Sequence, residues 1–264
     1  MCLFDKGEIK ESLNLLKIIL DSYPNTYLEI DTKAFAQSQI DSKMNKILSD
    51  VRQIKSKHQY EEAIKTINLV LSVNSKHIEA ILEKSYVLFR LKKYEETIQT
   101  IDSILSTQPS NFEALFLKMD SLNNLKRFEE SIEALNKIIP KYPDQDDYYY
   151  LLGVAKEGLG QYKEAIEYFN KIEDEIPYEV KKYDKIGLCL HKMGNFKEAI
   201  TNFDTALENC VEPFQNMDAD VLIHKCHSLL KLNKKTTALK ILNKVLEMEP
   251  ENQIALKIKK MIEE

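Results

Sequence analysis

The sequence predicts an all-α protein built as a solenoid of stacked repeats, and three observations support this fold class. Prolines recur every 34 residues, at Pro109, Pro143 and Pro177. Aromatic residues recur with the same period, at Tyr94, Phe128 and Tyr162. Between them, apolar residues lie three or four positions apart, which is the spacing of one helical face. A fixed period of this length is typical of supersecondary units that stack and share a continuous core.

Three successive repeats, between residues 78 and 179, have the same order of residue types. An apolar segment such as Ala80–Leu82 is followed by an aromatic and two acids, as in Tyr94–Glu96, and then by a closing proline. This order resembles the tetratricopeptide-repeat family. The resemblance implies pairs of antiparallel helices that wind into a right-handed superhelix. It covers residues 44–252 of this chain.

The period defines three regions. Residues 1–43 would contain an N-terminal half-repeat, a connector and the start of a long helix. Six repeats follow, at residues 44–77, 78–111, 112–145, 146–179, 180–218 and 219–252. The fifth is five residues too long, and this excess predicts a lengthened loop at 209–218. Residues 253–264 would form a solvating cap helix with Ile254, Ile258 and Met261 turned inward.

The N-terminal region departs from the period. Apolar residues from Ile9 to Ile19 have helical spacing, and Pro24 ends that segment. The segment is a cap if Met1 is the true start, or the remnant of another repeat if the chain was cut from a longer protein. We expect a connector at 25–32 and an unusually long helix at 33–57, without a break near Asp41.

Small residues are expected where the two helices of a repeat cross. The second-helix positions are all small: Ala63, Thr97, Ser131, Ala165, Ala199 and Ala238. The first-helix positions are more varied: Val51, Ser85, Met119, Gly153, Gly187 and Cys226. Met119 is the worst fit and predicts a locally splayed or repacked pair. Lys235 replaces the aromatic that opens the other second helices, which lowers the expected stability of the sixth repeat.

Composition and charge exclude several classes. The net charge of −5 argues against nucleic-acid binding, which usually requires a basic stripe. The sequence has no apolar run of membrane-spanning length and no signal-peptide pattern at its start. Four sparse cysteines favour free thiols over a disulfide framework. We therefore expect a cytoplasmic protein.

In the family, first helices line a concave surface that holds peptides. We call the corresponding side of these helices, between the packing positions, the inner face. The predicted peptide-binding residues on it are Arg52, Tyr86, Phe89, Phe116, Asp120, Asn123, Tyr150 and Glu157. Aromatic anchors beside acids suit a partner segment with apolar and basic residues. The alternative is that some of these aromatics pack against a neighbouring repeat.

The sequence does not match a narrower group within this family. Repeats that grip the C-terminal carboxylate of heat-shock chaperones use a clamp of Lys, Asn and Arg on three first helices. Only Lys181 and Lys185 match that clamp here. The array is therefore predicted to be a generic one, without the complete carboxylate clamp.

No catalytic, metal or cofactor site is expected. The metal-ligand residue types that gather in the sequence are Cys189, His191, His224, Cys226 and His227. They lack the paired spacing of zinc sites, and Cys226 occupies a packing position. The chain also has no phosphate loop and no nucleophile elbow.

The sequence therefore predicts a protein-interaction scaffold that binds a peptide or helix of a partner, and not an enzyme. One alternative is a structural spacer or a self-association arm, including a homodimer formed through the array ends. RNA binding by helical repeats is a third reading, opposed by the acidic inner face.

Overall fold

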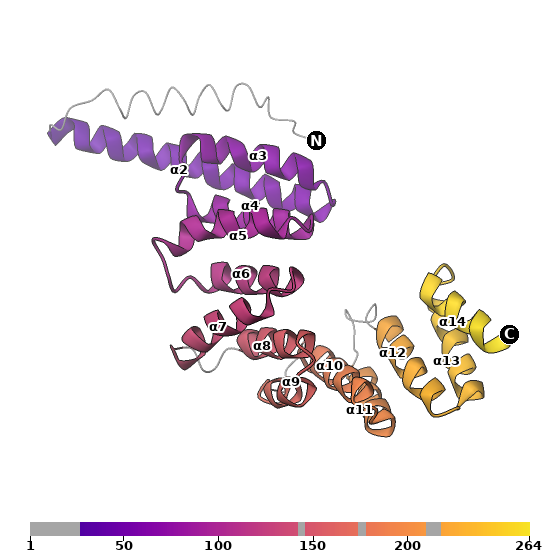
Figure 1. Cartoon of the computed structure of the whole chain (residues 1–264). Helices are drawn as coiled ribbons and strands as arrows, with labels where there is room; N and C mark the ends of the chain where they lie inside the picture. Colours follow the sequence, from indigo (N-terminus) through magenta and orange to yellow (C-terminus); the bar gives the residue numbers. More distant parts are fainter. Residues whose placement is uncertain (1–26, 142–145, 174–177, 210–217) are drawn as a thin grey trace. The chain divides into compact units, whose positions relative to one another are not determined.

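The computed structural model describes residues 27–141, 146–173, 178–209 and 218–264, and the side chains from residue 37 onward within most of these ranges. Within them every regular element is a helix, and no strand is present (Figure 1). This is the all-α helical-repeat solenoid that the period predicts. Within these ranges, no helix has the length and apolar character that a membrane crossing demands.

The helices alternate between first and second members of successive pairs. The first helices are α2 (Tyr27–Ser56), α4 (Ile78–Arg90), α6 (Phe112–Asn124), α8 (Asp146–Gly158), α10 (Tyr178–Lys192) and α12 (Asp218–Lys231). The second helices are α3 (Tyr60–Val73), α5 (Tyr94–Leu105), α7 (Phe128–Ile138), α9 (Tyr162–Phe169), α11 (Phe196–Glu208) and α13 (Lys235–Met248). A short 3₁₀ turn, η1 (Ile139–Lys141), follows α7, and α14 (Gln253–Glu263) comes last.

The chain divides into two compact units, which we describe separately. The first compact unit ends at Leu125, and the second begins at Lys126. The boundary therefore falls in the loop between α6 and α7. Met119, on α6, is the residue for which the sequence predicts poor packing in that pair, and it is 1% exposed.

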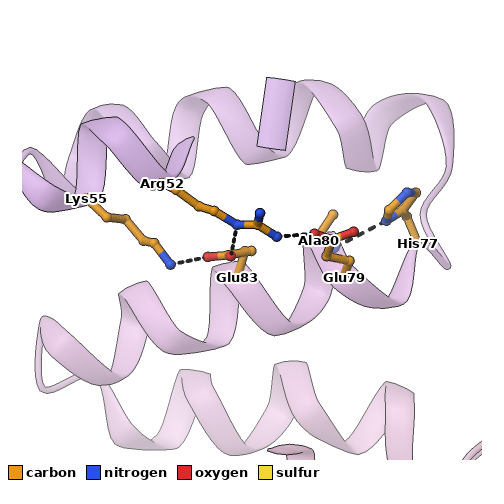
Figure 2. Close-up of polar contacts among 6 residues, drawn as sticks. All are labelled: Arg52, Lys55, His77, Glu79, Ala80 and Glu83. Carbon is orange, nitrogen blue, oxygen red and sulfur yellow. Dashed lines mark hydrogen bonds and ion pairs between the residues drawn. The ribbon is translucent and has the colours of Figure 1, made fainter. Parts of the chain in front are cut away.

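Side-chain caps fix where several first helices begin. His77 Nδ1 accepts a hydrogen bond of 3.3 Å from the backbone N–H of Ala80 at the start of α4 (Figure 2). Asn111 does the same for α6 and Asn252 for α14, each at 3.0 Å. These bonds satisfy one of the backbone N–H groups that the first turn of a helix leaves unpaired.

The turn between the helices of a pair uses one residue with positive φ. The residues are His58, Lys92, Lys126, Gly160, Gly194 and Asn233, with φ between 57° and 84°. At Lys92 the backbone N–H donates to Phe89 O at 2.8 Å, which closes the end of α4. Glycine adopts this backbone conformation without strain, whereas lysine and histidine do so at a cost.

The crossing positions of the second compact unit show why two of them are glycine. A Cβ atom on Gly153 would lie 2.5 Å from the ring of Phe169, and one on Gly187 would lie 2.5 Å from the ring of Phe203. Both phenylalanines are fully buried. The rings therefore occupy the space that first-helix side chains would otherwise need.

A similar fit links successive pairs. The ring of Phe128, which opens α7, fills the space where Gly158, at the end of α8, would carry a Cβ atom. In α13, where Lys235 replaces the aromatic, the helix still forms and buries Ala238, Leu242 and Val245.

Two expectations for the chain ends need correction. The connector predicted at 25–32 is helical from Tyr27, because α2 runs unbroken from Tyr27 to Ser56. In α14, Ile258 is buried as predicted, but Ile254 and Met261 are 55% and 68% exposed.

In α14 it is instead Ala255 that turns inward and is buried. Ala255 follows the capping Asn252 by three residues, as the buried Ala80 follows His77 and the buried Ala114 follows Asn111. The half-repeat predicted at 1–24 and most of the lengthened loop at 209–218 lie outside the described residues.

The Gly153–Phe169 fit predicts a specific loss of stability. Gly153→Ala should lower the free energy of unfolding by about 1–3 kcal/mol, the usual cost of overpacking. Urea unfolding followed by circular dichroism would measure it. In the double variant with Phe169→Leu, the two costs should be clearly less than additive. Simple additivity would show that the ring and the glycine do not constrain each other.

The turn geometry predicts a gain at Lys92. Lys92→Gly should raise the free energy of unfolding by about 0.5–1 kcal/mol, because it removes a side chain from a left-handed backbone. Lys93→Gly is the matched control, since Lys93 has φ −87° and should gain nothing. Equal effects of the two changes on the urea midpoint would contradict the assignment of strain to Lys92.

Candidate functional site

The inner face of the first compact unit begins with a network of charges between α2 and α4. Arg52 Nη2 lies 2.6 Å from Glu79 Oε1, and Arg52 Nε lies 3.6 Å from Glu83 Oε1. Lys55 Nζ also pairs with Glu83 Oε2. Figure 2 shows both cations reaching from α2 to the glutamates of α4. The partners are 27 and 28 residues apart in sequence.

Tyr86 is the most exposed of the predicted aromatic anchors. It lies on α4 and is 40% exposed. The ammonium of Lys55 stands 4.6 Å from the centroid of its ring, within the range of a cation–π contact. One side of the ring is thus supported while a large part of it remains accessible to solvent.

Phe89, one turn further along α4, is packed within the protein. Its ring meets that of Tyr94 edge-on, with centroids 5.4 Å apart. It also packs against the buried cluster that contains Ile101 and Leu117. Phe89 therefore follows the alternative stated above, in which some of the predicted aromatic anchors pack inside the protein.

The three predicted residues on α6 differ in exposure. Phe116 and Asp120 are half-buried, and Asp120 Oδ1 accepts a hydrogen bond of 3.0 Å from Asn124 Nδ2. Asn123 is only 6% exposed. Its burial is at odds with a ligand-binding role, so we do not retain it in the proposed surface.

The predicted residues of the second compact unit are also engaged within the protein. Tyr150 on α8 packs against the ring of Phe169, with centroids 6.0 Å apart. Glu157 Oε2 lies 2.8 Å from Lys185 Nζ on α10, and both side chains are largely buried. Burial alone would lower the pKa of Lys185, but the carboxylate of Glu157 outweighs it and raises that pKa.

The Lys55–Glu83 and Glu157–Lys185 ion pairs occupy equivalent places. In each pair the two residues are 28 positions apart. Three repeats separate the pairs, and the order of the charges is reversed. Sequence reasoning overlooked this network because it examined each helix face separately; a search for opposite charges 28 residues apart would have found it.

On α10 and α12, two histidines have hydrogen-bond partners and two cysteines are buried. His224 Nδ1 lies 2.7 Å from Asp184 Oδ1, and His191 Nδ1 lies 2.7 Å from Ser228 Oγ. Burial raises the pKa of the Cys189 and Cys226 thiols to about 12, so both are unreactive at neutral pH. Among the described residues, no three metal-ligand side chains are grouped to hold an ion.

The fold is that of an all-α helical-repeat protein, and its repeats indicate a protein-interaction scaffold. Residues 56–138 match the family model of the anaphase-promoting complex, cyclosome, subunit 3, and residues 146–176 and 183–209 match a tetratricopeptide-repeat model. These matches identify tetratricopeptide repeats within the chain. No curated protein matches it.

Solved structures share the fold at low sequence identity. A tetratricopeptide-repeat protein from Parabacteroides merdae has a TM-score of 0.69 and 15% identity, covering 96% of this chain and 100% of that one. MamA from Desulfovibrio magneticus has a TM-score of 0.54 and 22% identity, covering 62% of this chain and 93% of that one. YrrB, described as a TPR protein with an unusual peptide-binding site, has a TM-score of 0.50 and 19% identity, covering 74% of this chain and 97% of that one.

The Glu157–Lys185 pair predicts a testable energetic effect. Glu157→Gln should lower the free energy of unfolding by about 1 kcal/mol, because it leaves a largely buried ammonium without its carboxylate. The reversed double variant, Glu157→Lys with Lys185→Glu, should recover most of the loss, since Lys55–Glu83 already has that order.

Glu133→Gln is the control, because it breaks the exposed pair with Lys137 and should change nothing measurable. A Glu157→Gln effect no larger than this control, in urea unfolding, would contradict the prediction.

Proposed function

We propose that the chain binds an extended or helical segment of a partner protein along the inner face of the first compact unit. The observation that carries this proposal is the accessible ring of Tyr86, 40% exposed beside the charged groups of α2 and α4. Helices α4 and α6 contact each other, so half-buried Phe116 and Asp120 belong to the neighbouring stretch of this face. Aromatic side chains in such settings are frequent anchors of protein recognition.

The charge of this face favours a partner segment with basic residues. Four acids of this face, Glu79, Glu83, Glu113 and Asp120, outnumber its cations Arg52 and Lys55. Glu113 is exposed to solvent at the start of α6. An apolar side chain of the partner would rest on Tyr86 while Lys or Arg neighbours approach the acids.

In this proposal Arg52 has a positioning role. It is exposed and paired with Glu79, so it holds that carboxylate in place beside the anchor. Phe89 packs internally and would support the face from behind. Tyr150 and Glu157 belong to the second compact unit, where they contact Phe169 and Lys185, and they are not part of this surface. The peptide-binding site described for YrrB adds support by analogy, because YrrB shares this fold. We also propose a cytoplasmic location and no catalytic role.

Site-specific photo-crosslinking would test the proposal. A benzophenone amino acid would replace Tyr86, and the same group would replace Gln99, an exposed residue on α5, as a control. In lysate of the source organism, a partner should crosslink at position 86 and not at position 99, and mass spectrometry would identify it.

Tyr86→Ala in the unlabelled chain should weaken binding of that partner by about 2 kcal/mol, as expected of an anchor. Equal crosslinking at both positions, or unchanged affinity after Tyr86→Ala, would refute the inner-face assignment and favour a spacer or self-association role.

A further inference from the structure

The contact between α12 and α14 lacks the charge network found elsewhere on the inner face. The positions equivalent to Arg52 and Glu79 are His227 and Ile254, which are likewise 27 residues apart. The positions equivalent to Lys55 and Glu83 are Leu230 and Ile258. Where α2 and α4 are bridged by ion pairs, α12 and α14 therefore present apolar side chains and an unbridged imidazole.

A hollow of about 450 Å³ lies at this place, lined by His227, Gln253, Ile254, Lys257, Ile258 and Met261. Ile258 is buried and forms its apolar floor, whereas Ile254 and Met261 are more than half exposed. These two residues are the ones that the sequence predicts to turn inward. A pair of exposed apolar side chains beside a hollow is a feature of surfaces that receive a partner side chain.

The polar groups of the hollow give it positive character. Among the described residues that line it, none is Asp or Glu, and Lys257 and His227 are its ionisable groups. In the described part of the chain, neither of them forms a hydrogen bond or a salt bridge. Burial lowers the pKa of His227, and the positive charges of His224 and Lys192 lower it further, so the positive charge of the hollow comes from Lys257. The ammonium of Lys257 would attract a negatively charged ligand here.

We propose that this hollow docks a segment of a partner protein that carries an apolar side chain flanked by Asp or Glu. The apolar side chain would enter between Ile254 and Met261 and rest on Ile258. The flanking carboxylate would pair with Lys257 and with His227, which it would help to protonate. This preference is opposite to that of the Tyr86 surface and does not depend on it.

Selection from a phage-displayed library of random twelve-residue peptides would test this inference. The full chain and a Lys257→Glu/Met261→Asp variant would be immobilised side by side. Peptides enriched on the wild type and lost on the variant should carry Leu, Ile, Met or Phe next to Asp or Glu. In fluorescence polarisation, the variant should bind those peptides at least ten-fold more weakly, and added salt should weaken wild-type binding.

The matched control is Lys240→Glu/Met248→Asp, which makes the same chemical changes on α13 away from the hollow. It should bind like the wild type, and so should Tyr86→Ala, which separates this surface from the one proposed above. Because Lys257 and Met261 are exposed, both double variants should keep the wild-type circular dichroism spectrum.

Three results would overturn the proposal: no enrichment on the wild type, enriched peptides without acidic residues, or equal enrichment on the variant. A concentration-dependent mass in sedimentation that disappears in Met261→Asp would also overturn it, because a second copy of the chain would then occupy the hollow.

Discussion

The steric fit between the two helices of a pair is the constraint on which the rest of the structure depends. Gly153 and Gly187 admit the rings of Phe169 and Phe203, so the volume missing from one helix is supplied by the other. This fit fixes how closely the helices approach, as expected for interiors packed at crystal density. It thereby also sets which inner-face side chains of successive first helices can meet.

The 34-residue period was sufficient to predict the all-α repeat fold, because crossing residues, turns and caps each recur with it. It was harder to predict which side of a given helix faces the core. In α14, apolar residue type suggested that Ile254 and Met261 turn inward, but the alignment of Ala255 with Ala80 and Ala114 identifies the buried side correctly. In the N-terminal region, where the period is interrupted, a connector was expected at 25–32, but α2 is helical from Tyr27.

The candidate surface was less predictable than the fold. Tyr86 and Phe89 lie one turn apart on the same helix, yet only Phe89 is met by the ring of Tyr94. Glu157 is an acid at an inner-face position that suits ligand binding, but it forms an ion pair with Lys185 on the next first helix. Both outcomes depend on contacts between helices, which the spacing within one helix does not contain. Side-chain neighbours therefore decided exposure, whereas periodicity decided position.

The reversed order of Lys55–Glu83 and Glu157–Lys185 has a consequence for how the array assembles. Repeats of similar shape are prone to pair with the wrong neighbour during folding. If the first helices exchanged partners, Lys55 would face Lys185 and Glu157 would face Glu83, and like charges would repel each other in a largely dry contact. The opposite polarity of the two ion pairs would thus favour the native pairing of first helices over the exchanged one.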